Sequence, residues 1–292
     1  MLPKRCSDTI VIQTFRNHTI PGWIRRCLDS VSNWAGFHGH DYSLAGDEFY
    51  DLCGPEYLAR GSKNPQSITN LARLVATRQR LDAGYQRVIW MDADVFVFDP
   101  AKLMFDFSDE SLTTGYAFGR EVWLTRNSAG HFAVTPPRAH NAATLFTQNA
   151  IDLDMLITLI RHIDAGRQIV SNYQVGVALL RGLQYSLMFP TFSHVGLFSP
   201  ELLRALVERN EKLLEFYARV YRYQACAANL GLSKQITEGV IWQAMDNLEA
   251  SAGDAINKYA IEIGMHLIPY TETSLSSQRW LVGRFNEGPV LA

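Results

Sequence analysis

Short β-branched segments alternate with amphipathic segments of helical period over the first ninety residues, and this alternation most constrains the fold. Thr9–Phe15 (TIVIQTF), Asp41–Ala45 and Arg87–Met91 (RVIWM) have the length and composition of strands. Between them, a helix is predicted from Pro21 to about Trp34 and another over Ser67–Ala83. Strands joined through helices pair in parallel, so the order predicts an α/β fold with a mostly parallel central sheet.

The later part of the chain is less regular, and its character changes at Ser199. Ser199 followed by Pro200 is the pattern of a helix start, and helical sequence continues to about Asn229. We interpret residues 1–198 as a catalytic core and 199–292 as a mainly helical C-terminal extension packed on it. The other predicted elements are strands over Phe118–Leu124, His131–Thr135, Leu183–Phe189 and Ile261–Ile268, and helices over Leu153–Ile163 and Thr237–Leu248.

Composition excludes several classes of protein. The 292 residues suffice for one large domain, and 47% apolar with 19% charged residues is typical of globular proteins. A net charge of -2 gives no indication of a nucleic-acid partner. The four cysteines are far apart without a CxxC pair, which predicts reduced thiols rather than a zinc or disulfide framework.

Neither a signal peptide nor a transmembrane segment is apparent. Strand-like sequence follows the N-terminal basic residues directly, and the apolar run Val170–Leu183 is interrupted by polar residues. The sequence therefore predicts a cytoplasmic protein, with peripheral contact if it acts at a membrane.

Two carboxylates, Asp92 and Asp94, follow directly on the most apolar strand. Unpaired buried carboxylates are costly, so their usual place is the carboxyl end of a strand, where open α/β sheets bind ligands. Carboxylates there bind Mg²⁺ or Mn²⁺, and phosphate oxygens complete the coordination shell. The motif therefore predicts a metal-bound phosphorylated ligand, with a solvated turn as the alternative.

The surrounding residues resemble two groups of glycosyltransferases. VIWMDADVFVFDPAKLM is similar to the DXD segment of glycogenin-like retaining enzymes. The opening IVIQTFRNHTIPGWIRRCLDSVSNWAGFHGHDYSLAGDEFYD resembles DXD-containing sugar transferases related to yeast α-mannosyltransferases and bacterial capsule enzymes. Together these cover about the first half of the chain. They imply a GT-A-like nucleotide-sugar-binding sandwich, a UDP- or GDP-sugar donor and a Mn²⁺ or Mg²⁺ cofactor.

The resemblance assigns roles to residues in the first half. Asp92 would lie near the ribose and the metal, and Asp94 would be the firmer metal ligand. Gln13 and Thr14 would lie where base and ribose bind. Arg73 occupies the helical position of an Asp-x-x-Arg pattern, in which Asn70 replaces the Asp. A surface helix arginine is the alternative for Arg73.

Further roles follow from weaker matches downstream. Asn141 lies in a segment similar to the "FN(S/A)G" strand of the donor-sugar site, with Ala143 in place of the glycine. Gln174 matches a "DQ" pair that has lost its Asp, which implies a sugar-facing amide in the catalytic site. The third metal ligand would be His194, in a segment similar to "H-x-x-G", with His266 as the rival.

Both resembled groups retain the anomeric configuration, which implies a retaining transfer. An inverting transfer would instead require a base carboxylate near the acceptor, and Glu121, Asp152, Asp154 and Glu238 are candidates that the sequence does not separate. The acceptor, whether glycan, lipid-linked or protein, is not identified. Trp123 or Tyr116 is a candidate for stacking on an acceptor sugar.

Two other functions compete. A haloacid-dehalogenase-like phosphatase would use Asp92 as nucleophile, but that motif usually lies on the first strand and has Thr or Val where this chain has Phe96. A non-catalytic GT-A-like binding protein is the second alternative, favoured by the replaced motif residues and opposed by the intact pair of aspartates.

Overall fold

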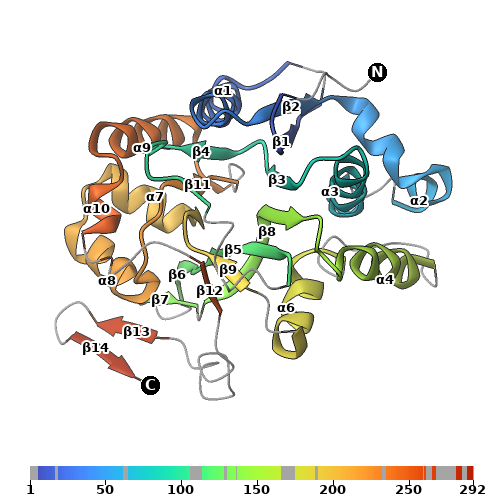
Figure 1. Ribbon diagram of the computed structural model, residues 1–292. Coiled ribbons are helices and arrows are strands. Elements are labelled where there is room, and N and C mark those ends of the chain that lie inside the picture. The colour runs from blue at the N-terminus through green and yellow to red at the C-terminus, as the bar shows by residue number, and fades with distance from the viewer. Residues whose placement is uncertain are drawn as a thin grey trace.

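The computed structural model describes residues 6–16, 19–61, 65–105, 114–127, 130–135, 137–165, 175–187, 190–231, 235–258, 260, 265–267, 281–284 and 288–291. Within these residues, most strands lie between helices, and the last two strands lie at the edge of the molecule near the C-terminus (Figure 1).

The largest sheet has the strand order β12-β9-β5-β8-β3-β1-β2. Its strands, in chain order, are β1 (Thr9–Thr14), β2 (Asp41–Ala45), β3 (Arg87–Met91), β5 (Tyr116–Glu121), β8 (Arg138–Thr147), β9 (Pro190–Phe192) and β12 (Met265–Leu267). β1 pairs in parallel with both β2 and β3, and β5 pairs in parallel with β9. β8 and β12 pair antiparallel with their neighbours. The α/β fold with a mostly parallel central sheet is therefore confirmed.

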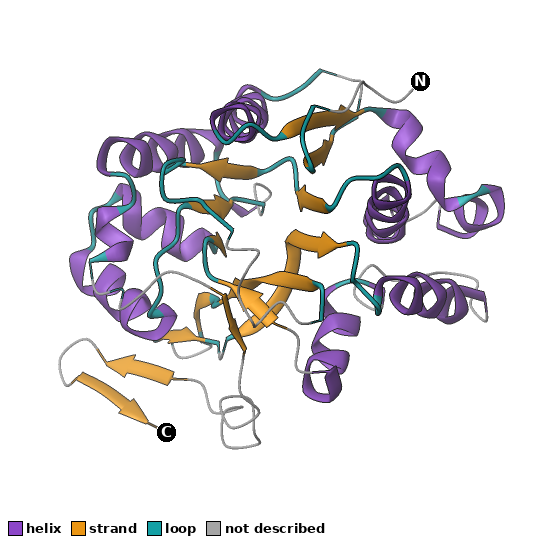
Figure 2. Ribbon diagram, in the orientation of Figure 1, coloured by secondary structure: helices purple, strands orange, loops and turns teal. Residues whose placement is uncertain are grey.

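Side-chain alternation along the first strands sets the layers of the fold. Successive strand residues face opposite sides of a sheet, and Ile10 and Ile12 belong to a different core cluster from Val11. The first cluster contains Leu71 of helix α3, and the second contains Val31 of helix α1. Helices thus cover both faces of the sheet (Figure 2).

The helices follow the predicted pattern in the first half. They are α1 (Gly22–Phe37), the 3₁₀ helix η1 (Asp47–Cys53), α2 (Pro55–Gly61), α3 (Pro65–Asp82), α4 (Leu153–Ala165), α6 (Val177–Leu187), α7 (Pro200–Val207), α8 (Glu211–Tyr221), α9 (Glu238–Ser251) and α10 (Asp254–Asn257). Proline opens the helical stretch at α1, α3 and α7, where its missing N–H needs no partner.

A second sheet, in the order β10-β11-β4, lies beside the first. It contains β4 (Val95–Val97), β10 (Val195–Leu197) and β11 (Ala227–Asn229). The chain leaves β3 of the large sheet at Met91 and enters β4 of the small sheet at Val95. Asp92 and Asp94 therefore lie where the chain crosses from one sheet to the other.

The third sheet has the order β14-β13-β7-β6. Its strands are β6 (Leu124–Arg126), β7 (Phe132–Val134), β13 (Leu281–Arg284) and β14 (Gly288–Leu291). The predicted strand over Phe118–Leu124 is divided between β5 and β6, which belong to different sheets.

The helical sequence predicted from Ser199 to about Asn229 forms two helices, α7 and α8, and the prediction is wrong after Tyr221. Ser199 does cap α7, accepting a hydrogen bond from the Leu202 N–H. Asn210 then caps a separate helix, α8, and the left-handed Arg222 (φ 67°) ends it. The chain continues into strand β11, so the region after residue 199 contributes to a sheet as well as to the helical layer.

The strand predicted over Leu183–Phe189 is also wrong for its described part, since residues 177–187 form helix α6. Short apolar runs fit both strands and buried helices, so the sequence pattern alone does not separate the two. Of the strand predicted over Ile261–Ile268, residues 265–267 form β12.

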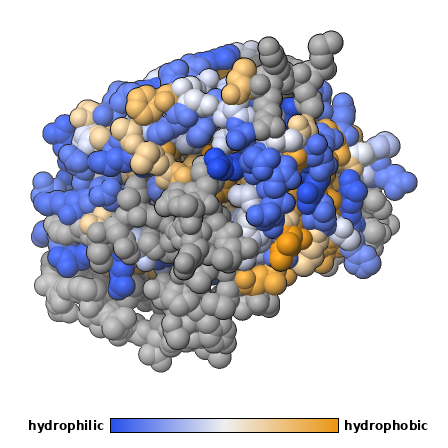
Figure 3. Space-filling model, viewed as in Figure 1, coloured by the Kyte–Doolittle hydropathy of each residue, from blue (hydrophilic) through white to orange (hydrophobic). Residues whose placement is uncertain are grey.

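The described surface in Figure 3 is mainly hydrophilic, with apolar residues gathered near the place of α6 in Figure 1. Among the described residues, none of the helices has the length and apolarity that a membrane crossing requires.

Candidate active site

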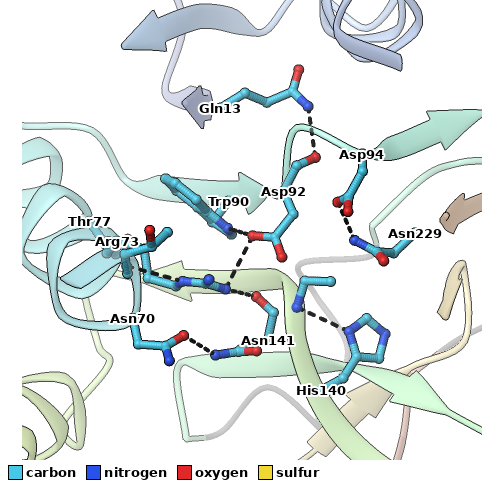
Figure 4. Close-up of polar contacts among 12 residues, drawn as sticks. Gln13, Asn70, Arg73, Thr77, Trp90, Asp92, Asp94, His140, Asn141 and Asn229 are labelled. Atoms are coloured by element: carbon cyan, nitrogen blue, oxygen red, sulfur yellow. Dashed lines mark hydrogen bonds and ion pairs between the residues drawn. The ribbon is translucent and has the colours of Figure 1, made fainter. Parts of the chain in front are cut away.

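The two aspartates occupy a tight turn between β3 and β4 (Figure 4). The Asp92 N–H donates to the Ala142 carbonyl of β8 at 2.7 Å, and the Val95 N–H donates to the Asp92 carbonyl at 3.0 Å. These bonds anchor the turn on both sides. Both carboxylates remain partly exposed, and both line a cavity.

Asp92 is held by an aromatic ring and a cation. Trp90 Nε1 donates to Asp92 Oδ1 at 2.7 Å, and Arg73 Nη1 lies 3.3 Å from the same oxygen. The guanidinium lies over the Trp90 ring, 5.2 Å from its centroid. Asp92 is thus oriented from the side of α3 and from its own strand.

Arg73 is a buried residue of the site, and its side chain is 7% exposed. Its guanidinium also donates to the Asn141 carbonyl. The Asn141 side chain in turn donates from Nδ2 to Oδ1 of Asn70 at 3.0 Å. Asn70 lies one helical turn before Arg73 on α3. The Asn that replaces Asp at position 70 therefore has a polar contact, and it links α3 to the β8 wall of the cavity.

Asp94 is held from the C-terminal part of the chain. Asn229, which ends β11, donates from Nδ2 to Asp94 Oδ1 at 2.5 Å. The Leu230 N–H donates to the Asp94 carbonyl at 2.9 Å. A Cβ added at Gly231 would lie 2.2 Å from Asp94 Oδ2, so this close approach requires glycine.

Among the described residues, the negative charge of the aspartate pair is only partly balanced. Burial raises the pKa of Asp94 to about 7, and the neighbouring Asp92 charge adds to the shift. Burial also raises the pKa of Asp92, although Arg73 and the Trp90 hydrogen bond oppose this shift. One guanidinium thus faces two carboxylates, an imbalance that a bound cation would relieve.

The cavity has a volume of about 800 Å³. Residues at the ends of several strands and residues of α3 and α6 line it. Ligand sites of this size typically combine apolar walls with a few polar groups. The lining residues are Thr14, Phe15, Arg16, Ile24, Tyr50, Gln66, Thr69, Asn70, Arg73, Trp90, Asp92, Ala93, Asp94, Glu121, Trp123, Thr135, Arg138, His140, Asn141, Ala142, Val177, Arg181, Leu197, Phe198, Asn229 and Gly231.

Of the two residues predicted at the end of β1, Thr14 lines this cavity and Gln13 lies behind it. Gln13 is fully buried; its Nε2 donates to the Asp92 carbonyl at 3.0 Å, and its Oε1 accepts from the Tyr42 hydroxyl at 2.9 Å. In this structure Gln13 supports the backbone of the aspartate turn. Contact of either residue with a nucleotide stays a prediction.

His140 is a buried, neutral part of the cavity wall. Its Nδ1 accepts from the Ala142 N–H at 3.1 Å, which leaves Nε2 to donate to the Val195 carbonyl at 3.2 Å. Burial lowers its pKa to about 4. A Cβ added at Gly119 would lie 2.3 Å from the ring, so glycine at the β5 irregularity makes room for this histidine.

The predicted third metal ligands lie apart from the pair or outside the described side chains. The His194 ring is buried, and its centroid lies 5.4 Å from that of Phe105, away from the cavity-lining set. His266 pairs through its backbone with Thr191, and its side chain is not described. Gln174 lies outside the described residues. Among the described residues, no three His, Cys, Asp or Glu side chains gather into a metal-binding group.

The structure separates the carboxylates proposed as a base. Glu121 lines the cavity and is paired with Arg181. By contrast, Asp152 accepts from the Tyr116 hydroxyl, and Asp154 pairs with Arg78. Of the two aromatic candidates, Trp123 lines the cavity and Tyr116 is fully buried in the core. Glu238 begins α9 and is not among the lining residues.

Sequence analysis missed Trp90 and Asn229 as polar partners of the aspartates. Trp90 is in an apolar strand, and only its spacing of two from Asp92 places both side chains on one face. Asn229 is remote in sequence and follows a segment predicted as helix, so no local pattern indicated it.

Comparison with other proteins gives distant likenesses. No protein-family model matches the chain, and no curated protein matches it. Among solved structures, a glycosyltransferase involved in the glycosylation of the major capsid of PBCV-1 has 13% identity and a TM-score of 0.43, over 83% of this chain and 99% of that one. The PaToxG glycosyltransferase has 10% identity and a TM-score of 0.35, over 87% of this chain and 86% of that one. A197 from STIV has 10% identity and a TM-score of 0.26, over 50% of this chain and 66% of that one. At these scores the likenesses carry no argument about function, which rests on the site itself.

Proposed function

We propose that this chain is a glycosyltransferase that uses a UDP- or GDP-sugar and a Mn²⁺ or Mg²⁺ ion held by Asp92 and Asp94. The observation that carries the proposal is the incompletely neutralised pair of carboxylates at a strand end, lining a cavity of about 800 Å³. The pKa of Asp94, which burial raises to about 7, supports the proposal of a cationic ligand at this site.

The donor set fits a hard divalent cation. Asp92 and Asp94 would supply part of its coordination shell, and diphosphate oxygens and water would supply the rest. When bound, the ion would neutralise charge on the leaving diphosphate. In the proposed reaction, the bond between the anomeric carbon and the diphosphate oxygen breaks and its electron pair stays with the diphosphate. The acceptor hydroxyl oxygen forms the new glycosidic bond, and its proton passes to the diphosphate or to water.

The chain's own residues would position these groups. Arg73 and Trp90 hold Asp92 in one orientation, and Asn229 holds Asp94. We also propose retention of configuration. Glu121, the candidate base that lines the cavity, is held by Arg181 Nη2 through both of its oxygens, at 3.2 and 3.3 Å, so both oxygens are already engaged by a cation.

Hydrolysis of a panel of UDP- and GDP-sugars tests this function, because a transferase that binds its donor near water is expected to hydrolyse it slowly without an acceptor. The expected result is release of one nucleotide with Mn²⁺, loss of release with EDTA, and loss in Asp94→Ala. Absence of turnover and of metal-dependent nucleotide binding across the panel would exclude the transferase and favour a non-catalytic binding protein. Release of inorganic phosphate from simple phosphate esters would favour the phosphatase alternative.

A further inference from the structure

The cavity extends beyond the aspartates to a second polar group. Glu121 ends β5, Arg138 begins β8, and the two residues are paired in the sheet. Arg181 of α6 reaches the same place and pairs with Glu121. Ala142, which binds the Asp92 N–H, is four residues from Arg138 on β8, so this group lies at most about 13 Å along the strand from the aspartate turn.

The Glu121–Arg181 pair is largely buried although it lines the cavity. The Glu121 side chain is 7% exposed and that of Arg181 is 23% exposed. Isolated surface ion pairs contribute little to stability, and buried ones have a desolvation cost. Because the pair is largely buried on the cavity wall, the Arg181 guanidinium and the Glu121 carboxylate offer a ligand hydrogen-bond donors and acceptors in fixed positions.

Trp123 gives this end of the cavity an aromatic wall. The backbone N–H of Trp123 donates to Thr135 Oγ1 at 2.9 Å, and the backbone N–H of Thr135 donates to the Trp123 carbonyl at 2.9 Å. Both residues line the cavity, and the reciprocal bonds hold together the backbone just before β6 and just after β7. Trp123 is half-buried, so part of its surface is available to a ligand.

We propose that this second end is the acceptor subsite and that it binds a pyranose ring of a glycan acceptor. The inference rests on the proposed function and adds the chemical class of the acceptor. The C–H face of the sugar lies against Trp123, and adjacent hydroxyls bind the Glu121 carboxylate and the Arg181 guanidinium. An aromatic wall beside paired donors and acceptors suits a sugar better than a lipid chain, which has no hydroxyls for the ion pair.

The cavity is large for a single small-molecule site. About 800 Å³ lies in the upper part of the range of roughly 300–1,000 Å³ that single small-molecule sites occupy. A donor held at Asp92 and Asp94 would leave the Glu121 end open for a second ring, within reach of the first.

Saturation-transfer NMR with a panel of methyl α- and β-glycosides of common hexoses, N-acetylhexosamines and pentoses tests the subsite without nucleotide or metal. We expect at least one glycoside to bind the wild-type protein. Trp123→Ala and Glu121→Gln should each weaken that binding about tenfold, and Trp123→Phe should restore part of it. Trp242→Ala is the matched control, because Trp242 is also partly exposed but lies on α9 outside the cavity-lining set.

Failure of the subsite is distinguishable from failure of the proposed function. Metal-dependent donor hydrolysis combined with no glycoside binding would overturn the acceptor subsite alone. Glycoside binding that is equal in wild type, Trp123→Ala and Glu121→Gln would also overturn it. Loss of function in Trp123→Ala through misfolding is detected by its thermal melt and is bypassed by Trp123→Phe and Glu121→Gln.

Discussion

Asn229 donates a hydrogen bond from its side-chain amide to Oδ1 of Asp94 at 2.5 Å, across 135 positions of sequence. The contact depends on β11 pairing antiparallel with β4, which sets Asn229 opposite Val95. The aspartate pair therefore draws its support from both halves of the chain.

Replacing Asn229 by alanine should weaken metal-dependent nucleotide binding about tenfold, because the hydrogen bond from Asn229 orients the Asp94 carboxylate that would hold the metal. Titration calorimetry of nucleotide with Mn²⁺ measures the effect. Asn247→Ala is the control, since the Asn247 side-chain amide also donates a hydrogen bond, to the Leu206 carbonyl, but Asn247 is not part of the cavity lining. Equal affinities in wild type and Asn229→Ala would contradict a supporting role for this amide.

Replacing Arg73 by glutamine should reduce the free energy of unfolding by about 3 kcal/mol at pH 8 without metal, because it leaves the Asp92 charge without its buried partner. Urea denaturation measures the change. Arg78→Gln on the same helix should cost less than about 1 kcal/mol, since its partner Asp154 is 71% exposed. Similar costs for the two variants would show that Arg73 is an ordinary surface arginine.

The stability of the protein should depend on the protonation of His140. The ordinary pKa of 6.5 applies in the unfolded chain, and burial lowers it to about 4 in the fold. As pH falls from 6.5 towards 4, the unfolded state gains a proton that the folded state excludes. The free energy of unfolding therefore falls by about 3 kcal/mol. The advantage of wild type over His140→Gln, measured by urea denaturation, should shrink by that amount between pH 7.5 and pH 4. Parallel pH profiles would contradict the prediction.

Gly119→Ala should destabilise the fold by about 2 kcal/mol, because its Cβ would lie 2.3 Å from the His140 ring. A thermal or urea melt measures this. Gly182→Ala is the matched control: nothing lies within 4 Å of the added Cβ, and alanine in a helix should stabilise the protein slightly. A Gly119→Ala variant as stable as wild type would mean that the β5 irregularity tolerates a side chain.

Local sequence patterns predicted the first half of the fold well. β2 and β3 have the predicted bounds, and α1 and α3 lie within a few residues of theirs. These elements combine strong periodicity with clear boundary residues, and each packs against sequence neighbours. The pattern Asn70-x-x-Arg73 also predicted a residue that the structure places against Asp92.

The remainder depends on contacts that local patterns do not encode. Asn229 reaches Asp94 because β11 enters a sheet with β4, whereas the preceding sequence has helical character as far as Tyr221. No local sequence pattern relates His194 to Asp94. The ring of His194 packs on Phe105, and His194 is not among the residues that line the cavity. The described part of α6 has an apolar composition that fits strand and helix alike, and packing decides between them.

Calorimetric titration of UDP and GDP into the protein, with Mn²⁺ and with EDTA, tests most directly whether Asp92 and Asp94 hold a metal-bound nucleotide. We predict that one nucleotide binds with Mn²⁺, that EDTA abolishes binding, and that Asp94→Asn weakens it at least about a hundredfold. Asp99→Asn should bind as wild type does, because Asp99 also follows a strand but pairs with Lys102 away from the cavity-lining residues. Binding that is independent of Mn²⁺ and equal in Asp94→Asn, or no binding of either nucleotide, would contradict the account.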